Sequence, residues 1–259
     1  MKIGLMQGRL SLPTNGHIQE FPEDWKSEFK VLEECGLQGV EWLITKGCAL
    51  DNPMYIAPAE ASAYPITSIC LDTLVDERII DEDYLNENLV TLCRVLVEQT
   101  TLRNITIPLL EDSSMTDAAT REKFCILIKK IGDSFPSIRF SFEAELDIQC
   151  LLEIVSLCDN FYVTYDTGNI TSYGLNHSEY IDFFAAKINN VHLKDRTFDA
   201  KTVSPLEGDT DFKSIFKGLG EIGYNGPFVL QTARAETGRE KQTILEHKRI
   251  FEDLYEEFI

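Results

Sequence analysis

Short apolar runs of the β type alternate with longer helical patterns along the whole chain, and this alternation constrains the fold most. Such strict alternation implies a parallel sheet whose strands are joined by crossover helices. Strands are predicted at Lys2–Met6, Gly39–Leu43, Ile66–Leu71, Asn104–Pro108, Ile138–Glu143, Phe161–Asp166, Ile188–Leu193 and Pro227–Gln231. Helices are predicted near Trp25–Cys35, Ala57–Ala63, Asp83–Gln99, Asp117–Ile131, Asp147–Leu157, Ser178–Ala185, Asp211–Ile222 and Arg239–Phe258.

Eight strand-helix units in 259 residues favour closure of the sheet into a barrel. A (β/α)8 TIM barrel takes about 250 residues. The alternative is an open, doubly wound sheet that binds a nucleotide. The first strand is followed by QGRLSLPTNG and not by the glycine-rich GxGxxG pattern, which argues against that alternative. We therefore predict an α/β fold, a (β/α)8 barrel, as a single domain over residues 1–259.

The formal net charge of −19 restricts the partners of the chain. A field of this sign repels nucleic acid and anionic membrane surfaces, so we expect a small molecule as partner. The seven cysteines are odd in number, are scattered and form no CxxC pair, which is typical of a reducing compartment. The opening MKIGLMQGRL lacks the long apolar segment of a signal peptide. We expect a cytoplasmic protein.

Four consecutive predicted strands end in residues that can bind a metal ion. These are Glu143, Asp166, His192 and Gln231. The strand ends of such a barrel meet at one rim, where the active site lies. Two carboxylates, an imidazole and an amide suit one divalent ion, with Mn²⁺, Mg²⁺, Co²⁺ and Zn²⁺ as candidates. Taken singly, three of them have a structural alternative: Glu143 as a capping acid, Asp166 in an Asx turn and His192 as a hydrogen-bonded core residue. Gln231 alone indicates almost nothing.

Further polar residues at the strand ends are candidates for substrate binding. They are Gln7, Arg9, Glu41, Asp72, Lys194, Arg196 and Arg234. The four basic ones would form an arc that holds a phosphate or carboxylate. The alternative is that Lys194 and Arg196 pair with acids of their own loop. The segment Thr197–Asp209 is either a cover for the site or an ordinary surface connection.

Several stretches of the second half resemble a known superfamily. They are YDTGN (Tyr165–Asn169), NVHLKDR (Asn190–Arg196), GDTDFKSIF (Gly208–Phe216) and GYNGPFVLQTAR (Gly223–Arg234). They look like the xylose isomerase-like TIM barrels, and within these like the sugar phosphate isomerase/epimerase proteins. The opening IGLMQGRL and the segment GVEWL also fit, so the resemblance covers nearly the whole chain.

The resemblance implies one divalent metal held by Glu143, Asp166, His192 and the residue at position 231. The superfamily has Glu at this last position, whereas this chain has Gln. The 3-epimerases of the superfamily use two metal-bound glutamates as acid and base, so Glu143 and Gln231 are the candidate catalytic pair. An amide cannot accept a proton at neutral pH, which leaves Glu143 as the base. A substitute second acid would have to be Glu41, Asp72 or Asp195.

We therefore expect a divalent-metal-dependent isomerase or epimerase of a small sugar or sugar phosphate. A keto-polyol dehydratase or lyase on the same scaffold is the first alternative. A sugar-binding barrel without catalytic activity is the second, and the glutamine favours it. Phosphodiester cleavage is disfavoured, because the chain has only four histidines and is strongly acidic. The identity of the sugar, the metal and the oligomeric state, with a homodimer as one option, stay open.

Overall fold

The computed structural model describes residues 1–13, 19–48 and 51–259. Its strands form a closed parallel barrel in the order β1-β10-β7-β6-β5-β4-β3-β2. The barrel strands are β1 (Ile3–Met6), β2 (Val40–Leu43), β3 (Ile66–Cys70), β4 (Asn104–Leu109), β5 (Arg139–Ala144), β6 (Phe161–Asp166), β7 (Ile188–Leu193) and β10 (Phe228–Leu230). The predicted barrel is confirmed, and each strand lies within two residues of its predicted bounds.

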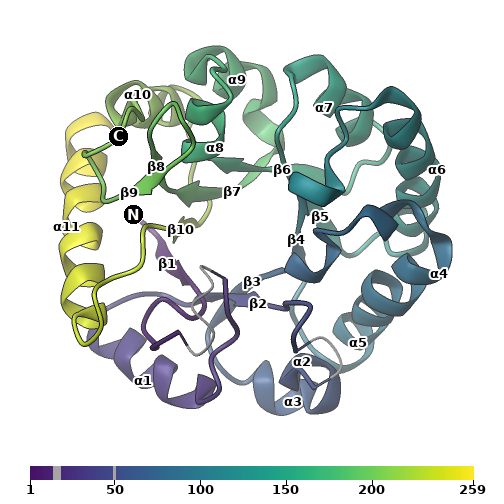
Figure 1. Ribbon diagram of the computed structural model, residues 1–259, viewed down its shortest axis with the longest axis horizontal. Helices are drawn as coiled ribbons and strands as arrows, with labels where there is room; N and C mark the ends of the chain where they lie inside the picture. The colour runs from purple at the N-terminus through teal and green to yellow at the C-terminus, as the bar shows by residue number, and fades with distance from the viewer. Residues whose placement is uncertain (14–18, 49–50) are drawn as a thin grey trace. The chain divides into compact units, whose positions relative to one another are not determined.

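The chain divides into two compact units. The first comprises residues 1–41 and 164–259. In it, β10 pairs in parallel with β1 and with β7, so Val229 lies opposite both Gly4 and His192. Its helices are α1 (Trp25–Glu34), α8 (Thr167–Ser172), α9 (His177–Phe184), the short η5 (Ala185–Lys187), α10 (Phe212–Glu221) and α11 (Glu240–Phe258). Figure 1 shows α10 beside α11, and Phe212 and Phe216 of α10 pack against Phe251 of α11.

The second unit comprises residues 42–163. Its centre is the long pairing of β4 with β5, which runs from Asn104 opposite Arg139 to Leu109 opposite Ala144. Phe142 packs edge-on against both Phe124 and Phe161. Its helices are α2 (Pro53–Ile56), α3 (Pro58–Ala61), α4 (Glu82–Leu85), α5 (Thr91–Gln99), α6 (Ala118–Ser134) and α7 (Ile148–Val155), with short turns η1 (Asp72–Leu74), η2 (Glu77–Ile80) and η4 (Glu111–Ser113). The single domain over residues 1–259 stays a prediction.

The structure differs from the predicted helices in three places. The region Ala57–Ala63, expected to hold one helix, holds only the short helix α3, and a further short helix, α2, precedes it; a proline begins each of them. The helix expected over Asp83–Gln99 is interrupted by the π-helical turn η3 (Asn86–Val90). The helix α8 was not predicted. It begins directly at the end of β6, where the TGN sequence has little helical propensity.

A short antiparallel pair also lies in the loop after β7. It consists of β8 (Asp195–Arg196) and β9 (Thr202–Val203), so part of the segment Thr197–Asp209 is ordered as a hairpin. Phe198 donates its N–H to Asp209 within this segment, at 2.8 Å. Whether the segment covers a bound substrate stays a prediction.

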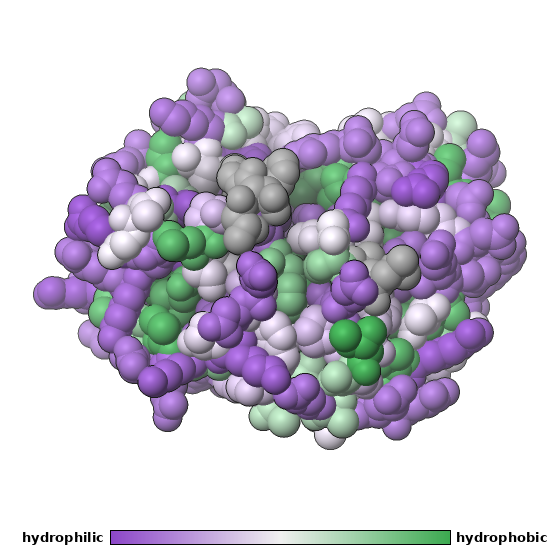
Figure 2. All heavy atoms as spheres, turned by 60° about the horizontal axis from the view of Figure 1, so that its bottom comes forward, coloured by the Kyte–Doolittle hydropathy of each residue, from purple (hydrophilic) through white to green (hydrophobic). Residues whose placement is uncertain are grey.

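The exterior is polar on the face that Figure 2 shows. The face in Figure 2 is mostly hydrophilic, with scattered hydrophobic residues. In the described part of the chain, no helix combines the length and the apolar character needed to cross a membrane. All seven cysteines are free thiols.

Candidate metal centre

Asp166 ends β6 and at the same time caps the helix that follows. Its Oδ1 accepts the backbone N–H of Asn169 at 2.8 Å, which satisfies one of the free donors at the start of α8. Its Oδ2 accepts a hydrogen bond from Lys194 Nζ at 2.9 Å. The carboxylate is buried, with 2% of the residue exposed. The capping interaction explains why the sequence YDTGN turns from strand to helix at this point.

Lys194 follows β7 directly, and its ammonium is the counter-charge of Asp166. The stem of the side chain lies across Gly168 in the first turn of α8. A Cβ at position 168 would come within 2.9 Å of Lys194 Cγ and Cδ. The backbone of Lys194 is bound in addition to Thr167, whose Oγ1 donates to Lys194 O at 2.6 Å. The glycine of the TGN sequence therefore provides the space that lets Lys194 reach Asp166.

His192 lies on β7 in a fully buried hydrogen-bonded cluster. Its Nε2 is 3.1 Å from Glu41 Oε1, and the other oxygen of Glu41 accepts from Asn190 Nδ2 at 2.5 Å. Asn190 Nδ2 also lies 3.2 Å from His192 Nε2. Glu41 and His192 are both 0% exposed. Glu41 was predicted to contact the substrate, and the structure places it against His192.

Gln231 follows β10, the strand beside β7. Its backbone N–H donates to Leu193 O at 3.1 Å, which continues the parallel register beyond Leu230. Side chains two residues apart on a strand share a face, so Gln231 is on the face of Val229, the residue opposite His192. Gln231 is 4% exposed, and its Oε1 has no hydrogen-bond partner. A buried carbonyl oxygen without a donor is costly, and a bound cation would satisfy it.

Glu143 belongs to the second unit, where β5 pairs with β4 and places it opposite Pro108. The residue is 2% exposed. Burial is the main reason why the pKa of Asp72 rises to about 6, and the negative charges of Glu143 and Glu111 raise it further. Glu143 and Asp72 therefore influence each other electrostatically in this unit.

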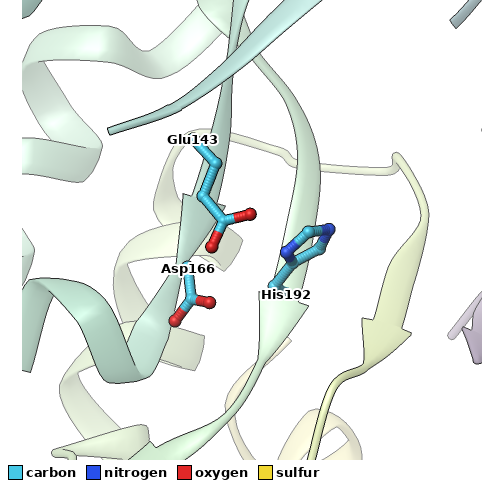
Figure 3. Close-up of side chains that lie close together, drawn as sticks. All are labelled: Glu143, Asp166 and His192. Atoms are coloured by element: carbon cyan, nitrogen blue, oxygen red, sulfur yellow. The ribbon is translucent and has the colours of Figure 1, made fainter. Parts of the chain in front are cut away.

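Three of the four predicted ligands meet a geometric criterion for a metal site. One ligand atom from each of Glu143, Asp166 and His192 lies within 4.8 Å of the other two, and all three residues are buried. Figure 3 shows one ring nitrogen of His192 turned toward the two carboxylates and the other turned away from them. Carboxylate oxygens, an imidazole nitrogen and the amide oxygen of Gln231 are all atoms that can coordinate a divalent ion. The donor set therefore fits a divalent ion.

The predicted basic residues occupy two separate environments. Arg9 is buried, and its Nε donates to Thr232 O at 3.2 Å. Arg234 NH1 donates to Gly8 O at 2.8 Å. Burial lowers the pKa of Arg9 to about 9, with a further contribution from the charge of Arg234. Arg9 and Arg234 are thus close neighbours at the ends of β1 and β10.

Lys194 and Arg196 are held by contacts of a different kind. Lys194 pairs with Asp166, whereas Arg196 NH1 lies 3.4 Å from Ser172 Oγ at the end of α8. The acids of their own loop were the expected alternative partners. Asp195 instead accepts backbone N–H groups, from Gly208 at 3.0 Å and Thr210 at 3.3 Å.

Sequence reasoning missed two buried residues that support the predicted ones. Asn190 precedes His192 by two residues, so the period of the strand places both on one face. Glu28, on α1, accepts the backbone N–H groups of Gly8 and Leu10, each at 2.9 Å. The position of Asn190, two residues before the candidate ligand His192, could have identified it from the sequence. Nothing in the sequence distinguishes Glu28 from the other acidic residues of its helix.

Comparisons with known proteins agree with the fold. The family model of the xylose isomerase-like TIM barrel matches residues 135–253. No curated protein matches the sequence. The resemblance to xylose isomerase-like barrels, predicted from the sequence motifs, is confirmed.

Solved structures match over nearly the whole chain. IOLI protein with a binding zinc atom has a TM-score of 0.77 at 15% identity, covering 100% of this chain and 99% of its own. The probable 3-DHS dehydratase AsbF from Bacillus anthracis has 0.71 at 15%, covering 97% and 99%. A sugar phosphate isomerase/epimerase from Parabacteroides distasonis has 0.70 at 15%, covering 96% and 94%. At such identities the likeness establishes the fold alone.

Proposed function

We propose that this xylose isomerase-like barrel is a divalent-metal-dependent isomerase or epimerase of a small sugar or sugar phosphate. The observation that carries the proposal is the buried group of Glu143, Asp166 and His192, with ligand atoms within 4.8 Å of one another. The orphaned Oε1 of Gln231, on the strand next to His192, supports a fourth contact to the ion. A zinc atom in one similar structure supports the class of cofactor.

The proposed ligands have different roles in the reaction because their side chains differ in chemistry. A divalent ion held there would polarise a substrate carbonyl. Glu143 is the proposed base, which takes the proton from the hydroxyl-bearing carbon next to the carbonyl and delivers a proton to the former carbonyl carbon on the same face, while the hydroxyl proton passes to the former carbonyl oxygen. Gln231 contributes an oxygen ligand but no proton transfer, because its amide does not titrate. One base on one face favours aldose–ketose isomerisation over epimerisation.

The remaining candidates are proposed as substrate contacts. Arg9 and Arg234 would together hold an anionic group such as a phosphate, and Arg196, Gln7 and Asp72 would bind other polar groups of the substrate. The pKa of about 6 at Asp72 gives it a protonated fraction near neutral pH, so it can also donate a hydrogen bond. A cytoplasmic location belongs to the same proposal.

The first test separates metal binding from catalysis. The purified protein, freed of metal by chelation, is titrated with Mn²⁺, Co²⁺ and Zn²⁺ by calorimetry, and one ion per chain is expected to bind. Loaded protein is then incubated with a panel of ketoses and ketose phosphates in D₂O and the products are analysed by NMR. Isomerisation keeps the carbon and oxygen count, and it introduces deuterium to the extent that the proton held by Glu143 exchanges with D₂O before it is returned.

The variant Glu143→Gln identifies the base. It should retain the fold and abolish turnover, whereas Glu122→Gln, an exposed change of the same charge on α6, should leave turnover intact. Turnover that survives Glu143→Gln would exclude Glu143 as the base. If no divalent ion binds the wild type, the proposal is wrong.

The dehydratase is the second candidate, and a similar fold in a probable dehydratase favours it. Loss of water from the substrate in the NMR experiment would identify it. Metal and sugar binding without any product would instead favour a barrel that only binds sugars, in agreement with the missing second acid at Gln231.

A further inference from the structure

The buried contact between Glu41 and His192 decides which ring nitrogen of the histidine is available to a ligand. Nε2 lies 3.1 Å from Glu41 Oε1. An ionised carboxylate only accepts hydrogen bonds, so a favourable contact at this distance requires a proton on Nε2. Without that proton, two lone pairs would face each other inside a dry core. The contact therefore favours the tautomer with the proton on Nε2 and the ring lone pair on Nδ1.

Asn190 holds the carboxylate in the orientation that this contact needs. Its Nδ2 donates to Glu41 Oε2 at 2.5 Å, so the two oxygens of Glu41 have different partners. The reverse orientation of the amide would bring two acceptor oxygens together and is excluded by the same reasoning. Asn190 Nδ2 also lies 3.2 Å from Nε2, and both atoms are donors in this arrangement. No hydrogen bond joins these two donors, and the charge-assisted bond from Nε2 to the carboxylate outweighs their contact.

We infer that Glu41 is a positioning residue that fixes the tautomer of His192 and presents its Nδ1 to a divalent cation. This inference rests on the proposed metal site. Figure 3 shows one ring nitrogen facing the two carboxylates and the other facing away, which is the orientation that the inference requires. A carboxylate bound to the second nitrogen of a metal-binding histidine orients the ring and raises its basicity. Glu41 thus acts through His192 and needs no contact with the substrate.

The metal-free protein provides the direct test. The chain has four histidines, so long-range ¹H–¹⁵N NMR spectra of the imidazole rings contain few signals. The signals of His192 are assigned by their loss in His192→Asn. We expect Nε2 protonated and Nδ1 unprotonated. If Nδ1 carries the proton instead, Nε2 accepts from Asn190 and the inference is refuted. This measurement needs neither metal nor substrate.

The variant Glu41→Gln tests the cause. The oxygen of the new amide would keep the bond from Asn190, and its NH₂ group would then face Nε2. Nε2 must accept that hydrogen bond, so the proton moves to Nδ1. We expect the NMR spectrum to show the changed tautomer and the Kd for Zn²⁺ to rise about 10- to 100-fold.

Glu28→Gln is the matched control, because Glu28 is also a buried acid of the first unit but binds backbone N–H groups of Gly8 and Leu10. It should leave the tautomer of His192 and the Kd for Zn²⁺ unchanged. An unchanged tautomer in Glu41→Gln overturns the inference even if metal binding weakens. Failure of Zn²⁺ and the other ions to bind the wild type refutes the proposed function, whereas the tautomer still decides the role of Glu41.

Discussion

Replacement of Lys194 by methionine should destabilise the metal-free protein far more than the metal-loaded protein. Methionine preserves most of the stem that crosses Gly168 but removes the ammonium bound to Asp166 Oδ2 at 2.9 Å. Both side chains are nearly inaccessible, at 9% and 1% exposure. The change therefore leaves a buried carboxylate without its counter-charge.

The magnitude follows from the burial of the pair. Loss of one partner of a buried ion pair costs about 3–5 kcal/mol. For a domain of this size, each kcal/mol lowers Tm by about 2–4 °C, so Tm should fall by roughly 6–20 °C in chelator. A divalent ion bound to Asp166 would replace the missing positive charge. In saturating Zn²⁺ we therefore expect a clearly smaller loss of Tm.

Thermal unfolding in EDTA and in excess Zn²⁺ measures the loss of Tm in the metal-free and in the metal-loaded protein. The removal of a positive charge next to a metal ligand should also tighten Zn²⁺ binding by about tenfold or more, because a like charge nearby disfavours a cation. Lys217→Met is the control, since Lys217 carries the same charge at 68% exposure on α10. An equal loss of Tm with and without Zn²⁺ would show that Lys194 does not neutralise a cation site. No loss in EDTA would show that the ion pair does not stabilise the fold.

Three further predictions concern the neighbouring residues. Gln231→Glu should lower the Tm of the metal-free protein and tighten Zn²⁺ binding about tenfold or more in calorimetry, since a buried orphan oxygen becomes an anionic ligand. Gly168→Ala should cost about 1–3 kcal/mol in urea unfolding, because the new Cβ would come within 2.9 Å of the Lys194 stem. Burial raises the pKa of Glu28 to about 6, so this carboxyl is protonated more readily in the folded state. Its contribution to stability is fully present below about pH 4.5 and should fall by about 2 kcal/mol in total once the pH has risen well above 6, and Glu28→Gln should remove that part of the pH dependence.

The sequence was sufficient to predict the barrel, because each strand is an apolar run of the right length between helical patterns. The positions of Glu143, Asp166 and His192 at or near strand ends followed from the same patterns. The ion pair of Asp166 with Lys194 did not, since it depends on a glycine in a helix that local propensity does not predict. Glu41 was correctly predicted to lie on the second strand, but it was predicted to bind the substrate. Its contact with His192 depends on the register between strands far apart in sequence.

The charges around the proposed site connect Gln231 with Lys194. Of the four proposed ligands only Glu143 and Asp166 are anionic, and Lys194 already neutralises Asp166 through a bond at 2.9 Å. Glu41 adds a carboxylate, but its contact with His192 directs it to the imidazole. A divalent ion at this site would thus meet fewer uncompensated negative charges than at a site with Glu in place of Gln231, which is the ligand set that the sequence resemblance implies. Each missing negative charge weakens the binding of a cation. Lys194 and Gln231 both reduce the metal affinity in this way, so Lys194→Met and Gln231→Glu should both increase it.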